Sequence, residues 1–424
     1  MGSTSPEELA ATLLEQCLQG ADVSTALIDE LAEMAASAER GTASAASRAL
    51  FSGLVEPLAD RFEPRLCEAY VRIFSRVIER VEPAWDAAAL AARYERVRRF
   101  RPFDAARERP ERVYVLSRVT LGADVAITSV MLDAAKKRFP AAEIYFVGEK
   151  KAWELFAADA RIAHLPVAYG RQATLRERLE AGGSLREALG APGAIVIDPD
   201  SRLSQLGLLP LCDEQRYYFF ESRCYGGDGG ESLSRLAMRW VAEVFGVANA
   251  VPYVAPLAEG DPGEAGIAVS LGVGGNPAKR LADPFEERLL AGLAERGLPV
   301  TVDRGAGGEE AERVNRALAA LGPAGGRIRT WDGSFAGFAR RIAGSRLFVG
   351  YDSAGQHVAA VCGVPLVSIF AGYVSRRMFL RWQPTGLGAA VVVAAEGEET
   401  ETVLRQVLAG VDRCLAGGRS RPTV

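Results

Sequence analysis

Hydrophobic residues in the first quarter of the chain recur at helical spacing. Leu9, Leu13 and Cys17 follow Ser5-Pro6-Glu7-Glu8, a helix start in which Ser5 is the N-cap and Glu8 closes a capping box. Further amphipathic stretches follow at about 24–37, 44–58, 62–80 and 86–99. Because no strand pattern occurs in this part, we expect residues 1–108 to form an all-α domain of its own.

From Arg112 onward the hydrophobic period changes. Short apolar runs predict buried strands at 113–116, 144–147, 194–198 and 217–220. A helical pattern over 125–139 separates the first two strands, and strands that alternate with helices are typical of βαβ units and a parallel sheet. We therefore expect a Rossmann-like domain over residues 109–255.

The same alternation starts again after a stretch rich in glycine and proline at 255–264. Strands are predicted at 267–271, 299–303, 328–330, 347–351 and 365–370. The first helix between them is expected to begin at Pro284, with Asp283 as its N-cap. The pattern predicts a second Rossmann-like domain over 262–395. A C-terminal helix and tail over 396–424 could lie against either sheet.

The predicted fold class is thus α/β, with two Rossmann-like, doubly wound domains preceded by an all-α N-terminal module. In open α/β sheets, ligands bind beyond the carboxyl ends of the strands. The cleft between the two α/β domains is therefore the expected site.

Composition narrows the classes of function. The 424 residues carry 54 acidic and 50 basic side chains, and a net charge of −4 disfavours a nucleic-acid-binding protein. Six cysteines without a CxxC pair and only two histidines disfavour a metal site, so none is expected. No apolar run reaches the ~18 residues of a spanning helix, and the N-terminus lacks a signal-peptide pattern. A cytoplasmic protein is the expectation.

The first candidate for chemistry is Asp124, in the turn after the strand at 113–116. A carboxylate beside a helix N-terminus is held ionised by the helix dipole and stands at the edge of the sheet, which suits a general base. The competing interpretation is an acid that only stabilises its own helix.

The second candidate is the turn from Gly272 to Lys279. Glycines after a strand, here including Gly274 and Gly275, let backbone N–H groups approach an anion, and Lys279 adds a point charge. The turn departs from the dinucleotide fingerprint at Pro277, where glycine or alanine is required, and it is not a Walker motif. Phosphate binding and an ordinary glycine-rich turn both remain open.

The third candidate follows the strand at 347–351. Asp352, Ser353, Gly355 and His357 converge on the head of a short helix. Backbone N–H groups at that head, together with the Ser353 hydroxyl, can hold an anion. The competing interpretation is a histidine that only packs in the core.

Weaker candidates lie on other elements. Glu309 and Glu310 open the helix after the strand at 299–303, where they could bind ribose hydroxyls or serve as ordinary first-turn acids. Arg376 and Arg377 stand among aromatic residues and could meet a charged acceptor or belong to a packed loop. The basic run at 96–101 is typical of a solvated helix face, and a contact with anionic lipid is the less favoured interpretation.

One family motif can be recognised after the first strand of the α/β region. Arg118, Asp124 and Val125 match at the same spacing the first motif of the heptosyltransferase-type glycosyltransferases, although the glycines of that motif's turn are altered here. Residues of about 112–395 resemble this family (family 9, GT-B fold). Its members are two-domain inverting enzymes that use an ADP-activated sugar.

Two further signatures of the family have counterparts in the second α/β domain. A glycine-containing loop that ends in Lys-Arg-Trp corresponds to Lys279-Arg280-Leu281. The motif Asp-Ser-Gly-x-x-His-Leu-Ala-Ala corresponds to residues 352–360, with Ala354 in place of the glycine. The N-terminal helical region lies outside the resemblance.

The resemblance implies a role for each part of the site. Asp124 would take the proton from the acceptor hydroxyl, while Lys279, Ser353 and the helix head would hold the departing diphosphate in place of a metal. Asp352 and His357 would contact the sugar or its phosphates, and Glu309 or Glu310 would contact the ribose. The acceptor-side candidates are Arg118, Thr120, Arg376 and Arg377.

The preferred hypothesis is an inverting, metal-independent glycosyltransferase. It would move heptose from ADP-heptose, or another sugar from its nucleotide sugar, to a hydroxyl of a glycan, a lipid-linked glycan or a protein. No cofactor besides this donor substrate is expected, and any membrane contact would be peripheral. The alternative is a non-catalytic protein that binds sugar nucleotides or glycans. A nicotinamide-dependent oxidoreductase, suggested by Gly272, Gly274 and Asp303, is disfavoured by Pro277.

Overall fold

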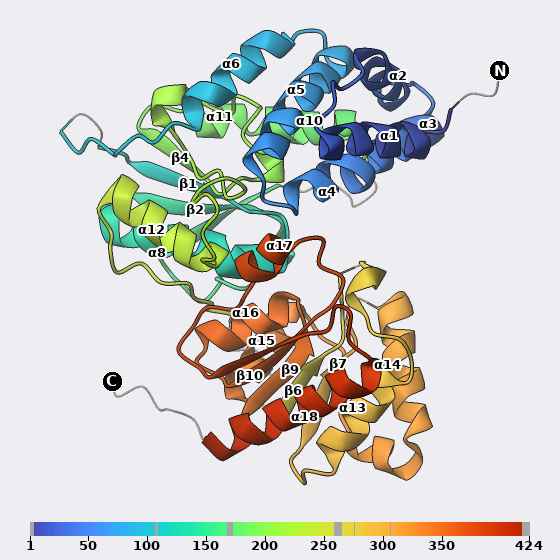
Figure 1. The fold of residues 1–424 in the computed structure, drawn as a ribbon. Helices are drawn as coiled ribbons and strands as arrows, with labels where there is room; N and C mark the ends of the chain where they lie inside the picture. The colour runs from blue at the N-terminus through green and yellow to red at the C-terminus, as the bar shows by residue number, and fades with distance from the viewer. Residues whose placement is uncertain are drawn as a thin grey trace.

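The computed structural model describes residues 4–106, 109–167, 173–257, 265–274, 276–305 and 307–417. Figure 1 shows a helical region in blue, followed by two α/β units that each contain one sheet. The helices of the N-terminal region are α1 (Pro6–Gln19), α2 (Thr25–Ala35), α3 (Arg40–Arg48), a π-helical segment (Ala49–Val55), α4 (Glu56–Ala59), α5 (Pro64–Val81) and α6 (Ala87–Val97). The predicted capping box is present at the start of α1, where Ser5 and Glu8 exchange hydrogen bonds of 2.9 and 3.2 Å.

The first α/β unit contains five parallel strands in the order β3-β2-β1-β4-β5. The strands are β1 (Arg112–Leu116), β2 (Glu143–Gly148), β3 (Ile162–Pro166), β4 (Ala194–Asp198) and β5 (Tyr217–Phe219). Its helices are α7 (Leu121–Ala123), a π-helical segment (Asp124–Thr128), α8 (Ser129–Arg138), α9 (Lys150–Trp153), α10 (Leu175–Ser184), α11 (Arg186–Leu189) and α12 (Leu233–Phe245), with short 3₁₀ turns at Arg202–Ser204 and Glu214–Arg216. The edge strand β3 was not among the predicted strands.

The N-terminal helices cover one face of this first sheet. Because successive strand residues point to opposite faces, Val113 packs with α8 and α12, whereas Tyr114 belongs to the same buried cluster as Phe74 of α5 and Tyr94 of α6. Figure 1 shows α5, α6 and α10 on one side of the sheet, and α8 and α12 on the other. The core of the helical region therefore continues into that of the first α/β unit.

The second α/β unit contains six parallel strands in the order β11-β10-β9-β6-β7-β8. The strands are β6 (Ile267–Ser270), β7 (Val300–Asp303), β8 (Arg329–Trp331), β9 (Leu347–Tyr351), β10 (Leu366–Phe370) and β11 (Ala390–Ala394). The helices are α13 (Phe285–Ala294), α14 (Gly308–Ala320), α15 (Phe335–Gly344), α16 (Ala354–Val361), α17 (Arg376–Arg381) and α18 (Thr400–Gly417), with 3₁₀ turns at Pro277–Lys279 and Gly322–Arg327. Strand β11 was not predicted.

Two expectations about this unit are now decided. The C-terminal helix α18 packs on the second sheet, because Val403 and Val407 share a buried cluster with Val367 of β10. Asp283 does not cap a helix: α13 begins at Phe285, and the Asp283 carboxylate instead accepts a hydrogen bond from Arg313 at 3.0 Å.

Both sheets reverse their strand order beside their first strand, between β1 and β4 and between β6 and β9. This reversal is the topological switch point at which open α/β sheets bind ligands. The predicted fold class is confirmed. The three candidate segments, which contain Asp124, Lys279 and Asp352, follow β1, β6 and β9 at these switch points.

Candidate functional site

The switch point of the second sheet holds a partly buried ion pair. Lys279 ends the 3₁₀ turn after β6, and Asp352 follows β9. The Lys279 Nζ atom donates to the Asp352 carboxylate at 2.8 Å and to its carbonyl oxygen at 3.3 Å, and the lysine side chain is 19% exposed. Gln356 donates to the other carboxylate oxygen. The structure thus brings together two of the predicted donor-binding residues.

His357 lies in the same place but carries no charge. Its ring is buried in α16 and packs edge-on against Trp382, with 6.0 Å between the ring centroids. Burial lowers the pKa of His357 to about 4, although the Asp352 carboxylate raises it. The imidazole is therefore neutral at pH 7. It can form a hydrogen bond with a phosphate but brings no positive charge to it.

The head of α16 carries a hydroxyl without a partner. Ser353 is the N-cap residue, yet among the described residues its buried Oγ atom has no hydrogen-bond partner and caps no backbone N–H group. Gly355 is a glycine for a packing reason, because a Cβ there would lie 2.5 Å from the Phe348 ring. Ser353 thus fits the predicted anion site at this helix head, whereas Gly355 serves the contact with β9.

The backbone N–H groups of the glycine-rich turn after β6 already bind a carboxylate side chain of the protein itself. The Glu310 carboxylate accepts hydrogen bonds from the backbone N–H groups of Val273 at 3.1 Å and Gly274 at 3.3 Å. Gly274 has a φ of +63°, a conformation that favours glycine. Of the other predicted residues, Glu309 is exposed and pairs with Arg280 at 3.5 Å, and Gly275 lies outside the described residues.

In the first unit, the Asp124 carboxylate is buried within its own unit. It is 0% exposed and accepts hydrogen bonds from the Ser117 hydroxyl at 2.8 Å, the Arg118 backbone N–H at 2.7 Å and the Thr128 hydroxyl at 2.7 Å. Burial raises the pKa of Asp124 to about 6, although these hydrogen bonds lower it. The carboxylate joins the end of β1 to the following helix, and this arrangement favours the structural interpretation over that of a base.

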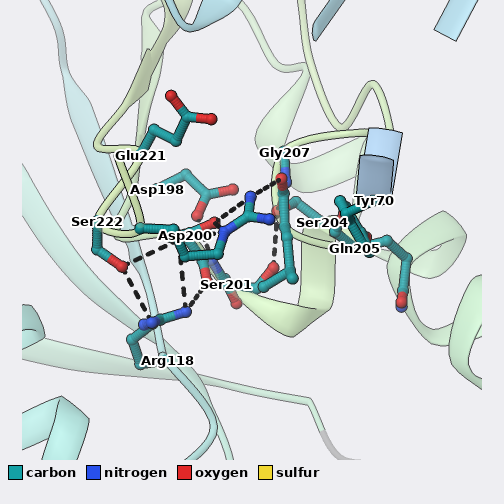
Figure 2. Close-up of polar contacts among 12 residues, drawn as sticks. Tyr70, Arg118, Asp198, Asp200, Ser201, Ser204, Gln205, Gly207, Glu221 and Ser222 are labelled. Carbon is teal, nitrogen blue, oxygen red and sulfur yellow. Dashed lines mark hydrogen bonds and ion pairs between the residues drawn. The ribbon is translucent and has the colours of Figure 1, made fainter. Parts of the chain in front are cut away.

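Arg118 belongs to a buried polar network at the carboxyl ends of β4 and β5. It donates to the Asp200 carbonyl oxygen and, at 3.0 Å, to the Ser222 hydroxyl, as Figure 2 shows. The fully buried Asp200 carboxylate also pairs with Arg223 at 2.9 Å. Sequence reasoning missed Asp200, Ser222 and Arg223. The available signal was Asp198-Pro199-Asp200, in which one acid ends a predicted strand and the other follows it by two residues.

The backbone around this network is strained. Four residues other than glycine have a positive φ there, namely Val119 (74°), Asp200 (72°), Gln205 (48°) and Leu206 (53°). Such conformations cluster at functional sites and persist only where the surroundings hold them. The helical region supplies one such support, because the Tyr70 hydroxyl donates to the Gln205 carbonyl at 2.7 Å.

The two α/β units meet directly at the head of α16. A Cβ atom on Gly122 would lie 3.4 Å from Cα of Ala354 and from Cδ2 of His357. Ala123 of the first unit and Val358 of the second share one buried apolar cluster. The turn that carries the first family motif therefore packs on the segment that carries the third.

The remaining acceptor-side candidates are separated. Thr120 is exposed at the N-cap of α7, where its side chain makes no capping hydrogen bond, and Arg376 is exposed at the start of α17. Arg377 is not free, because it donates to the Phe62 carbonyl at 2.6 Å and pairs with Asp228. Arg377 therefore joins the second unit to the helical region and the first unit.

Among the described residues, one group of three side chains could hold a metal ion. The ligand atoms of Cys67, Glu221 and Cys224 lie within 4.8 Å of one another, between α5 and the segment after β5. Both carboxylate oxygens of Glu221 already accept hydrogen bonds, from the Tyr94 hydroxyl and from Arg98. In the part of the chain that the structure describes, no helix is both long and apolar enough to cross a membrane.

The two facing α/β units form the two-domain fold of the heptosyltransferases. A glycosyl transferase family 9 structure from Veillonella parvula is 16% identical, with a TM-score of 0.55 over 73% of this chain and 99% of that one. An E. coli heptosyltransferase with ADP-2-deoxy-2-fluoro heptose is 18% identical, with a TM-score of 0.51 over 72% and 99%. The E. coli ADP-heptose lipopolysaccharide heptosyltransferase II is 17% identical, with a TM-score of 0.50 over 72% and 99%.

No family model and no curated protein matches the sequence. At identities this low the similarity establishes the fold, and one fold hosts many functions. An activity must therefore be argued from the chemistry of the site.

Proposed function

We propose that this protein is a glycosyltransferase that moves a sugar from a nucleotide sugar to an acceptor hydroxyl. One observation carries the proposal: the Lys279 ammonium and the unpartnered Ser353 hydroxyl stand at the head of α16, at the switch point of the second sheet. Backbone N–H groups at a helix head, a hydroxyl and a compact cation together suit a diphosphate.

The same residues support a displacement without a metal. As the bond from the sugar to the diphosphate breaks, negative charge develops on the leaving oxygen, and Lys279 with the N–H groups of α16 would stabilise it. A single attack from the opposite face of the sugar would invert the anomeric centre. Neutral His357 would contribute a hydrogen bond to the sugar or its phosphates, since its pKa of about 4 leaves it without charge.

The identities of the donor and the acceptor are proposed by analogy with solved structures of the same fold. Structures of this fold include one with an ADP-heptose analogue, and we propose ADP-heptose as the first donor to test. The acceptor would be a glycan, a lipid-linked glycan or a protein, and the reaction would take place in the cytoplasm. Binding of the diphosphate at the glycine-rich turn would require that Glu310 leave the N–H groups of Val273 and Gly274.

A second candidate function is a non-catalytic protein that binds sugar nucleotides. The burial of Asp124 favours it, because a carboxylate with three hydrogen bonds inside its own unit cannot reach an acceptor hydroxyl without rearrangement. Under this alternative the protein binds the donor and releases no product.

The test is calorimetric titration with ADP-heptose, UDP-glucose and GDP-mannose, followed by measurement of the nucleoside diphosphate released. Binding and release of ADP from ADP-heptose support the transferase. Binding without release across glycan, lipid-linked and protein acceptors supports the alternative, and failure to bind any of the three would contradict both.

A further inference from the structure

Two cysteines and one carboxylate meet where the helical region packs against the first α/β unit. Cys67 belongs to α5, whereas Glu221 and Cys224 lie in the segment after β5. The two sulfur atoms and a Glu221 carboxylate oxygen all lie within 4.8 Å of one another. Cys67 is 2% exposed and Glu221 is 7% exposed, so this thiol cluster lies inside the protein rather than on its surface.

The separations within the thiol cluster suit a zinc ion. Zinc binds thiolate sulfur at about 2.3 Å, so two sulfur ligands of a tetrahedral ion stand about 3.8 Å apart. Ligand atoms that lie within 4.8 Å of one another therefore need to approach by no more than about 1 Å. Two sulfur ligands favour zinc over Mg²⁺ and Ca²⁺, which take oxygen ligands.

The carboxylate of the thiol cluster is already held in position by two neighbours. One Glu221 oxygen accepts a hydrogen bond from the Tyr94 hydroxyl of α6, and the other accepts one from Arg98 at 3.1 Å. A carboxylate oxygen has two lone pairs, so it can accept a hydrogen bond and also bind a metal ion. In known metal sites, hydrogen bonds of this kind orient the ligands.

The charges around the thiol cluster are compensated in pairs. Arg98 pairs with Glu221 at 3.0 Å. The buried Arg223 pairs with Asp200 at 2.9 Å, and it donates to the Tyr94 hydroxyl at 3.1 Å. A divalent cation that displaces one proton from each of two thiols adds no net charge to these buried pairs. Binding of zinc therefore leaves no uncompensated charge inside the protein, which would be costly.

A cavity connects the thiol cluster with solvent. Its volume is about 420 Å³, and Glu221 and the half-buried Cys224 are among the residues that line it. A metal ion can therefore reach its ligands in the folded protein. Because the cluster supplies three ligands, the fourth position of a tetrahedral ion would take a water molecule from this cavity.

We propose that Cys67, Glu221 and Cys224 bind a zinc ion that fastens α5 to the segment after β5. Each thiol gives up one proton to solvent as its sulfur binds the metal, and nothing is oxidised or reduced. The ion would join the helical region to the first α/β unit and take no part in the displacement proposed at Lys279. The proposal therefore stands apart from the proposed glycosyltransferase activity.

The test is titration of the reduced protein, dialysed against a chelator, with Zn²⁺ and with Cd²⁺. Cd²⁺ is a soft ion that reports its sulfur ligands through an ultraviolet charge-transfer band. We expect about one ion per chain, a thiolate band with Cd²⁺, and release of about two protons for each Zn²⁺ bound. Zn²⁺ should also raise the unfolding temperature, because it binds the folded state.

Variants assign the ligands. Cys67→Ala and Cys224→Ala should each weaken Zn²⁺ binding at least about 100-fold, since loss of a ligand costs more than the 10–100-fold lost with a residue that only orients one. Two free cysteines outside the cluster supply matched controls: Cys17→Ala, at a buried position of α1, and Cys212→Ala, at a half-buried position of the first unit. Both controls should bind Zn²⁺ as the wild type does.

The wild-type titration decides the proposal even where a variant does not fold. Binding of Zn²⁺ without proton release and without a thiolate band for Cd²⁺ would assign the ion to surface carboxylates and overturn the proposal. Failure of the reduced protein to bind either ion would overturn it as well. A thiolate band that is unchanged in both Cys67→Ala and Cys224→Ala would show that other cysteines hold the metal, which would also contradict it.

Discussion

The carboxyl edges of the two sheets are built in opposite ways. At the first sheet, Asp124, Asp200 and Arg223 are fully buried and bonded to neighbours in the same unit. At the second sheet, Lys279 is partly exposed, and the Ser353 hydroxyl has no partner in the part of the chain that the structure describes. Saturated hydrogen bonds hold a loop in one conformation, whereas unused donors are available to a ligand. The residues at the edge of the first sheet therefore maintain the structure, and we expect the ligand to bind at the edge of the second sheet.

The largest effect should come from breaking the buried pair of the first edge. Asp200→Ala leaves the Arg223 guanidinium, 1% exposed, without its carboxylate, and should lower the free energy of unfolding by about 3–5 kcal/mol. Denaturant unfolding measures this loss. The exposed Arg40–Glu177 pair provides the control, because Arg40→Met should change stability by less than about 1 kcal/mol. A loss of similar size in both variants would contradict the distinction between scaffold and surface.

At the carboxyl edge of the second sheet, removal of an ion pair should weaken ADP binding rather than lower the free energy of unfolding. The double variant Lys279→Met with Asp352→Asn removes both charges, so neither is left buried alone, and unfolding should change by about 1 kcal/mol. We expect ADP binding, measured by calorimetry, to weaken about 100-fold, or about 2.7 kcal/mol. The matched double variant Lys151→Met with Glu149→Gln, at another ion pair, should bind ADP as the wild type does. Unchanged binding by the first variant would remove the phosphate role of Lys279.

The pH dependence of stability tests whether Asp124 is scaffold. A carboxyl whose folded pKa, here about 6, lies above its unfolded value binds its proton more tightly in the folded state, so stability falls as pH rises from about 4 to about 6 and is level above. Asp124→Asn should remove part of this fall and leave stability at pH 7 within about 1 kcal/mol of the wild type's. Unfolding curves at about pH 4.5 and 7 would show it. Turnover lost at unchanged stability would instead make Asp124 catalytic.

The smallest effect is expected at the glycine-rich turn. Glu310→Gln weakens the carboxylate's hold on the N–H groups of Val273 and Gly274, which a phosphate would need. ADP should then bind about threefold more tightly, or about 0.6 kcal/mol. Weaker binding in the calorimeter would show that Glu310 contacts the nucleotide, as the family resemblance implies.

The regular elements could mostly be predicted because their pattern is local. The buried strands of both sheets appear as short apolar runs, and the alternation with helices indicates a parallel sheet. The two missed strands are edge strands, and each has two exposed residues and a single buried one among its five: β3, which contains His164 and ends at Pro166, and β11. In β3 the mixture of buried and exposed positions hides the strand, whereas β11 is an apolar run that sequence analysis passed over.

The candidate site could be predicted only in part. Lys279, Asp352 and His357 were found because each follows a strand or opens a helix, and the strands converge at one edge. Glu310 was assigned to ribose, because no local pattern shows that its carboxylate lies on the turn after another strand.

The sequence by itself determined the helices, the strands and the order in which they alternate, because hydrophobic periodicity acts over a few residues. Only the tertiary structure decided that the helical region covers the first sheet, that Asp124 lies buried, and that Arg377 bonds to the Phe62 carbonyl across 315 positions of the chain. The physical reason is that burial and charge depend on distance in space, which packing between distant elements creates.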